Sequence, residues 1–227
     1  MWVFPLVAAV VAFVFAGTLA ARYGRRRQAY QLAWAISLGM YGTASLMAVL
    51  GVVNGWTDVE FAAYWGLGAV LNVPFLAGGE VMLLARSRTV DLIVWLVLIF
   101  IVAYTVAVLR HATLEAAALL ERLPSGKEVF GDGSAAHRLP QLISIPSYAV
   151  LLAGTLWSAW TMRGRPELRD RFVGTLLIAV GATIVAGGAT FAALGNLPGF
   201  CATLVAGIVV MYLGFRKASS KPSVIEG

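Results

Sequence analysis

Apolar residues in this chain fall into long runs separated by short polar breaks. A helix needs about 20 mostly apolar residues to cross the hydrocarbon core of a bilayer. Seven runs come close to or exceed this length, namely 2–21, 31–53, 61–85, 92–109, 139–160, 172–194 and 198–215. None of them alternates between polar and apolar residues as a barrel strand would, and a lone span must satisfy its own backbone. The pattern predicts an all-α polytopic membrane protein with seven transmembrane helices.

The overall composition supports a bilayer as the solvent. Of the 227 residues, 60% are hydrophobic and only 12% are charged, whereas a soluble domain carries about 25% charged residues. So few charges cannot cover a water-soluble globule of this size. We therefore predict one transmembrane domain over 1–217 and a short polar tail over 218–227 that is disordered and cytoplasmic.

Basic residues predict the orientation of the spans. If the N-terminus lies outside, the cytoplasmic segments hold 13 of the 17 basic residues and the outer segments hold the remaining four. An excess of Lys and Arg in cytoplasmic loops is the usual topology signal. The chain is thus predicted to be N-out and C-in, in a cell (plasma or inner) membrane. Fourteen of the 17 basic residues are arginines, which hints at a GC-rich bacterial source.

Two similar segments suggest an internal duplication. The first span ends with FAGTLAAR at 15–22, and the fifth ends with LAGTLWSA at 152–159. Each is followed by an arginine-rich turn and by a span rich in small residues. This pattern indicates a 3+1+3 parallel repeat with the fourth span as a linker, an arrangement known in small transporters such as the sugar-exporting SWEET proteins. The Pro-Gln signature of those families is absent from the inner ends of spans one and five, so a chance match of common membrane residues is the alternative.

The third span, 61–85, is the most unusual because it carries an amide, a proline and a carboxylate. Pro74 removes a backbone donor near the centre and predicts a helix break. Asn72 is a candidate for ligand binding, with hydrogen bonding to another helix as the alternative. Glu80 is a second candidate because an intramembrane carboxylate is a functional hypothesis by default. It lies six residues before Arg86, so a structural or snorkelling role is the alternative.

The fifth span offers the second polar stripe. On a helical wheel Gln141, Ser144, Tyr148 and Thr155 share one face, and this stripe opens toward the outside. The first three are the candidates for ligand binding. We predict that they join Asn72 and Glu80 in a ligand site. Pro146 predicts a second helix break in the same span.

Between spans four and five lies the longest polar stretch, an outer loop over 111–139. Its first part, 111–123, shows helical spacing of apolar residues and predicts a continuation of span four or a helix on the membrane surface. The Gly-Asp-Gly sequence at 131–133 predicts a turn rather than a phosphate-binding loop, since no strand precedes it.

Several chemistries find no support in the sequence. The single cysteine, Cys201, excludes an intrachain disulfide and a cysteine metal site. His111 and His137 could hold zinc with nearby carboxylates, but their spacing is unspecific, and we predict no metal and no cofactor. The three lysines all lie outside the spans, which excludes a retinal Schiff base in the last one. Motifs for hydrolase or nucleotide chemistry are absent, which argues against an enzyme, and the arginine clusters fit membrane topology rather than nucleic acid.

Three longer segments resemble a known group of proteins. They are LAWAISL at 32–38, YWGLGAVLNVPFLAGG at 64–79 and LLIAVGATIVAGG at 176–188. Their sequences resemble those of uncharacterised small seven-span bacterial membrane proteins and, more distantly, the seven-helix sensor regions of some histidine kinases. The resemblance implies a seven-helix bundle but no specific function, and no transmitter domain follows the last span.

The sequence leaves three functional hypotheses. The first is binding or passive transport of a small neutral or amphipathic molecule or lipid, with a cavity between spans three and five. The second is a receptor-like sensor that signals through a separate partner. The third is an accessory or assembly subunit that packs against another membrane protein.

Overall fold

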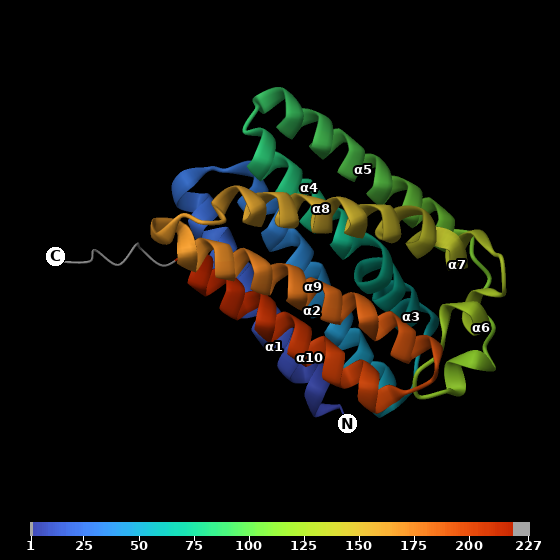
Figure 1. The fold of residues 1–227 in the computed structure, drawn as a ribbon. Helices are drawn as coiled ribbons and strands as arrows, with labels where there is room; N and C mark the ends of the chain where they lie inside the picture. Colours follow the sequence, from blue (N-terminus) through green and yellow to red (C-terminus); the bar gives the residue numbers. More distant parts are fainter. Residues whose placement is uncertain (1, 220–227) are drawn as a thin grey trace.

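The computed structural model describes residues 2–219 (Figure 1). Seven helical spans in this range are long and apolar enough to cross a membrane. They are Val3–Arg26, Ala29–Asn54, Asp58–Ala85, Arg88–Arg110, Ala135–Met162, Pro166–Ala192 and Leu197–Ala218. Each overlaps one predicted run, so the prediction of an all-α, seven-helix, multi-pass membrane protein is confirmed.

Four spans consist of one helix each, and three are built from shorter pieces. The single helices are α1 (Val3–Arg26), α2 (Ala29–Asn54), α5 (Arg88–Arg110) and α10 (Leu197–Ala218). The third span comprises α3 (Asp58–Ala63), a π-helical segment η1 (Tyr64–Leu71) and α4 (Asn72–Ala85). The fifth comprises α7 (Ala135–Leu139), a π-helical segment η3 (Pro140–Ser144) and α8 (Ile145–Met162), and the sixth comprises η4 (Pro166–Leu168) and α9 (Arg169–Ala193). Both π-helical segments lie beside a proline, where the regular i to i−4 ladder is interrupted.

Six of the seven spans form a closed ring. Around the ring, α1 contacts α2, α2 contacts α4, α4 contacts α8, α8 contacts α9, α9 contacts α10, and α10 contacts α1. The remaining helix, α5, packs outside the ring against α4 and η1. Spans one to three and five to seven thus form two arcs with the fourth span outside, which is the arrangement that a 3+1+3 repeat predicts. The duplication itself stays a prediction.

Helix α5 exposes most of its apolar surface. Of its residues, only Leu98 and Thr105 are buried, while Ile99 and Phe100 are 62% and 68% exposed. Such a surface suits lipid tails and would be costly in water. This face, with similar exposed residues on α1 and α8, supports a bilayer environment.

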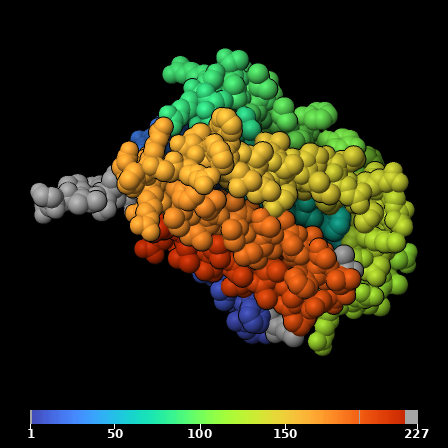
Figure 2. All heavy atoms as spheres, viewed as in Figure 1, coloured from blue at the N-terminus to red at the C-terminus, as the bar shows by residue number. Residues whose placement is uncertain are grey.

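Small residues bring α9 and α10 into close contact. A Cβ atom on Gly181 would lie 2.7 Å from the carbonyl oxygen of Gly207, and one on Gly214 would lie 2.7 Å from that of Gly174. Any larger residue there would push the helices apart. These two spans are therefore packed backbone to backbone, as is typical of membrane helices rich in small residues. Figure 2 shows α8 (yellow) beside α9 and α10 (orange to red) on one face of the molecule.

The two ends of the bundle differ in their connections. One end, which we name the arginine-rich end, carries the turns at Arg27, Arg86 and Arg163 and the end of α10 at Arg216. The opposite end, which we name the loop end, carries residues 111–139 (yellow-green at the right of Figure 1). By the positive-inside rule the arginine-rich end is expected to face the cytoplasm.

The loop over 111–139 is folded into the bundle. Its residues Leu119, Val129 and Phe130 are buried against Trp56 and Phe61. The sequence expectation of a helix over 111–123 is wrong, because α5 ends at Arg110 and only a single 3-10 turn, Ala118–Leu120, follows. The backbone N–H of Glu115 donates instead to the carbonyl of Val129 at 2.8 Å. This bond ties the segment back to the loop, which lets its leucines reach the aromatic cluster.

Two further expectations concern turns and the tail. Gly131 and Gly133 adopt positive φ values of 82° and 77°, so the predicted Gly-Asp-Gly turn is confirmed. The expected disordered tail over 218–227 falls mainly outside the described residues. Within them, Ala218 is the last residue of α10, and Ser219 accepts a hydrogen bond from Arg22 at 2.8 Å.

Candidate functional site

The helix break at Pro74 is satisfied by the fifth span. Pro74 has no N–H to offer to the carbonyl of Val70. The hydroxyl of Ser144 donates to that oxygen at 3.0 Å and to the carbonyl of Ala69 at 2.7 Å. In a bilayer an unpaired carbonyl would cost several kcal/mol. Ser144, predicted to bind a ligand, therefore has a structural role here.

Nearer the loop end, the third span in turn donates to a carbonyl of the fifth. Pro140 has no N–H for the carbonyl of Ala136, and the indole Nε1 of Trp65 donates to that oxygen at 3.0 Å. Each of these two spans thus caps a carbonyl that a proline frees in the other. The second predicted break, Pro146, lies exposed in the first turn of α8, directly after η3.

Helix α2 holds α4 from the other side. The Ser37 hydroxyl donates to the carbonyl of Asn72 at 2.7 Å, and Trp34 Nε1 donates to the carbonyl of Leu76 at 3.0 Å. The Trp34 ring lies against Gly79, where a Cβ would overlap it. A residue larger than glycine at position 79 would therefore displace the Trp34 ring.

These contacts place Glu80 at a fixed point in the bundle. Its side chain lies against Gly154 of α8, where a Cβ would be only 2.7 Å from Glu80 Cγ. Glu80 is 4% exposed. Among the described residues no hydrogen bond or ion pair reaches its carboxylate. Such burial disagrees with a snorkelling role, which would need an exposed carboxylate.

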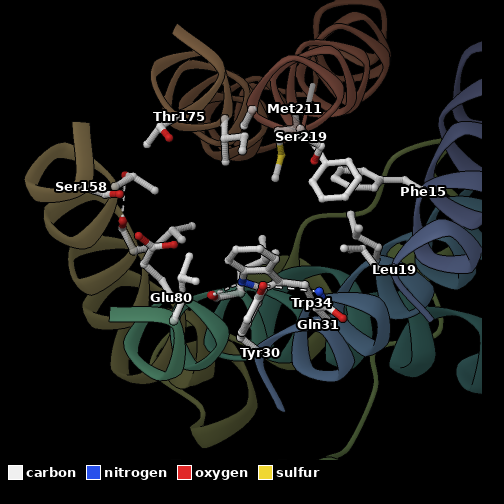
Figure 3. Close-up of a pocket in the computed structure, with 18 of the residues that line it drawn as sticks. Phe15, Leu19, Tyr30, Gln31, Trp34, Glu80, Ser158, Thr175, Met211 and Ser219 are labelled. Atoms are coloured by element: carbon white, nitrogen blue, oxygen red, sulfur yellow. Dashed lines mark hydrogen bonds between the residues drawn. The ribbon is translucent and has the colours of Figure 1, made fainter. Parts of the chain in front are cut away.

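Glu80 lines a cavity of about 190 Å³ at the arginine-rich end. All six helices of the ring contribute to its wall. The lining residues are Phe15, Leu19, Arg22, Tyr30, Gln31, Trp34, Leu38, Leu76, Glu80, Leu83, Leu151, Thr155, Ser158, Thr175, Ile178, Met211, Phe215, Ala218 and Ser219. Figure 3 shows the labelled side chains arranged around a central opening. A cavity of this volume is much larger than a single water molecule needs.

The cavity has an apolar inner part and a polar rim. Leu38, Leu151 and Met211 are at most 5% exposed and form part of the inner wall. Ser158 and Ser219, near the ends of α8 and α10, are more exposed and belong to the rim. An amphipathic molecule would therefore find both kinds of surface.

Gln31 is a second buried polar residue that lines the same cavity. Gln31 is 4% exposed, and its Nε2 donates to Gln28 Oε1 at 3.0 Å and to the hydroxyl oxygen of Tyr30 at 3.3 Å. Its Oε1 is buried without a hydrogen-bond partner among the described residues. This oxygen points away from the opening in Figure 3, so Glu80 presents the unpaired acceptor to the cavity.

Arg22 lines the cavity, and its guanidinium is held at the rim by other residues. Arg22 Nη1 donates to Ser219 Oγ at 2.8 Å, and the guanidinium lies 4.5 Å from the centre of the Phe215 ring. Both contacts hold it against α10. In Figure 3 Glu80 lies across the opening from Phe15 and Ser219. Arg22 therefore makes no ion pair with Glu80.

Between the cavity and the loop end, packed side chains fill the interior of the bundle. The Tyr41 hydroxyl donates to the carbonyl of Leu204 at 2.9 Å, and Phe200 and Ile208 belong to the same buried cluster. None of these four residues is among those that line the cavity.

The structure places the other predicted site residues apart. Asn72 is buried about two helical turns deeper than Glu80, and its Oδ1 has no hydrogen-bond partner among the described residues. Gln141 is exposed. The Tyr148 hydroxyl and Thr183 Oγ1 share a hydrogen bond of 2.8 Å between α8 and α9. Of the five predicted ligand-binding residues, Glu80 alone lines the cavity.

Sequence reasoning missed Gln31, Trp34 and Arg22. A signal was present, because Gln31 is a polar residue just inside the start of the second span, close to the depth expected for Glu80. Trp34 lies about one turn further along the same helix. Nothing in the pattern indicates that these residues face the third span.

Comparison with known proteins gives no further assignment. The resemblance to small seven-span bacterial membrane proteins accordingly stays a prediction, and the cavity is the basis for any functional proposal. No family model, curated protein or solved structure matches this chain.

Proposed function

We propose that this protein binds a small amphipathic molecule in the cavity at its arginine-rich end. The observation that carries the proposal is a cavity of about 190 Å³ that contains the unpaired carboxylate of Glu80. A polar group buried without a partner is costly, so its retention is explained if a ligand supplies the partner. Pockets for drug-sized ligands range from about 300 to 1,000 Å³, so this cavity suits a smaller molecule.

The expected orientation gives the side of entry. If the arginine-rich end faces the cytoplasm, the ligand reaches the cavity from the cytoplasm or the inner leaflet of a cell (plasma or inner) membrane. Passive transport would further require the cluster around Tyr41 and Leu204 to open. Binding is therefore the primary proposal, and transport would be a second step.

Site-specific labelling tests this function. Cys201 is the single cysteine and is buried, so a Cys201→Ser background can carry a new cysteine at Ser158 on the cavity rim. We expect a maleimide to label Ser158→Cys, and we expect at least one of the probes 1-hexylamine, 1-hexanol or hexanoate to slow this reaction in a saturable manner.

Thr161→Cys provides the matched control. Thr161 is exposed on the same helix and does not line the cavity. Its labelling should not depend on the probes. If no probe protects Ser158→Cys, or if both cysteines are protected equally, the cavity is not a binding site for small amphiphiles.

A further inference from the structure

We infer that the ligand of this cavity is a small amphipathic amine, bound through its protonated ammonium group to Glu80. This inference rests on the proposed function and adds the chemical class of the ligand. It depends on the pairing state of the buried polar atoms around the cavity.

The unpaired acceptor of the cavity is Glu80, whose two carboxylate oxygens have no partner among the described residues. The donors of Trp34 and Gln31 are already used, because Trp34 Nε1 donates to the Leu76 carbonyl and Gln31 Nε2 donates to two oxygens. The hydroxyls of Ser158 and Thr175 also line the cavity, but they carry no charge. A ligand that completes these bonds must donate hydrogen bonds. An ammonium group offers three donors and no acceptor.

Charge favours the same ligand. Lys217 pairs with Asp170 at 3.0 Å, outside the cavity, and Arg22 is held at the rim by Ser219 and Phe215. No protein cation among the described residues pairs with Glu80. Hydrogen bonds between ionised partners are shorter and roughly twice as strong as neutral ones. A cationic ligand can therefore supply a counter-charge that the protein does not provide.

The remaining walls suit the apolar part of such a ligand. Tyr30 and Trp34 line the cavity, with their rings 5.1 Å apart in an edge-to-face arrangement. Aromatic rings attract ammonium groups through their faces. Leu38, Leu151 and Met211 then offer an apolar surface for a short alkyl chain.

The three probes of the labelling experiment test the class of ligand. At pH 7 hexylamine is cationic, hexanol is neutral and hexanoate is anionic, while their alkyl chains are the same length. Protection of Ser158→Cys as a function of probe concentration gives an apparent Kd for each. We expect hexylamine to bind most tightly. Adding Glu80→Gln should weaken hexylamine by about tenfold or more, as expected for the loss of a hydrogen bond between charged groups, and should leave hexanol unchanged.

Glu167→Gln is the control, because Glu167 is an exposed carboxylate at the same end of the bundle and lies outside the cavity. It should not change the affinity for hexylamine. If hexanol or hexanoate binds as tightly as hexylamine, the amine inference fails while the binding function stands. If no probe binds, both fail. The ranking of the three probes decides the question even if the Glu80 variant does not fold.

Discussion

The loop end and the arginine-rich end of the helix ring differ in how they are filled. At the loop end, Phe61 is completely buried among Trp56, Tyr64, Trp65 and Phe130. At the arginine-rich end the ring encloses a cavity. One end thus buries a large aromatic cluster, and the other leaves space between six helices.

Polar groups can be compared in the same way. The indole donors of Trp56 and Trp65 are paired with the carbonyls of Arg122 and Ala136 at 3.3 and 3.0 Å. Unpaired atoms remain there too, namely Nδ1 of His137, whose ring is stacked against Trp65, and Oγ1 of Thr105. At the other end, Glu80 is unpaired. The loop end also carries a hollow of about 440 Å³ between α5 and the loop, lined by Tyr104, His111 and Phe130 among others. The two ends thus differ in where the open space lies, because it is outside the ring at the loop end and between the six ring helices at the arginine-rich end.

Truncation of one large side chain at each end should show the largest difference. Phe61→Ala should lower the free energy of unfolding by about 3–5 kcal/mol, because it opens a cavity in a filled cluster. Leu38→Ala should cost about 2 kcal/mol or less, because Leu38 already borders empty space. Unfolding in mild detergent measures both. Equal losses would show that the two ends are packed alike.

Removal of the tryptophan donor at each end should give the second largest loss in the free energy of unfolding, about 1–3 kcal/mol for the larger of the two. Trp65→Phe leaves the carbonyl that Pro140 frees without its donor, so the full cost of an unpaired buried group is expected. Trp34→Phe removes a donor from the Leu76 carbonyl, which lies within α4 and keeps the regular helical donor. That loss should be below about 1 kcal/mol. The reverse order in unfolding experiments would contradict the role assigned to Trp65.

Replacement of Glu80 by glutamine should not lower the free energy of unfolding. Glu80→Gln keeps the shape but removes a buried charge without a partner, so the free energy of unfolding should stay equal or rise by about 1 kcal/mol. Thermal unfolding without added probe measures this effect. A loss of more than about 1 kcal/mol would mean that the carboxylate is a structural group.

The smallest effect concerns pH at the loop end. Hydrogen bonds from the Ser125 hydroxyl and backbone N–H lower the pKa of Glu128 below its ordinary value of 4.5. The ionised form therefore stabilises the capping box above about pH 4.5, and this contribution is lost as the pH falls through the lowered pKa. We expect a few tenths of a kcal/mol, since the site is exposed.

Hydrogen exchange around residues 125–130, corrected for intrinsic rates, measures this local loosening. In Glu128→Gln the protection should be lower at neutral pH and should not change further on acidification. A wild-type loop whose protection is the same at pH 6 and pH 3 would show that the capping box contributes nothing.

Sequence reasoning located the third span as the unusual one, and Asn72, Pro74 and Glu80 do lie at its contacts with α2 and α8. It could not assign their roles. Ser144 has the same polarity as a ligand-binding serine, and only its distance to the carbonyl of Val70 shows that it compensates a proline. The helix expected over 111–123 is not formed, because Leu114 and Leu119 pack against an aromatic cluster that is distant in sequence.

The seven spans and their helical form could be predicted from the residue pattern alone. These properties follow locally, because each run in a bilayer must pair its own backbone whatever its neighbours are. Only the tertiary structure decided which polar atoms are paired and which remain free in a cavity. Pairing depends on where helices cross, as for Trp34 and Leu76, 42 residues apart. Hydropathy describes one residue at a time and carries no information on such contacts.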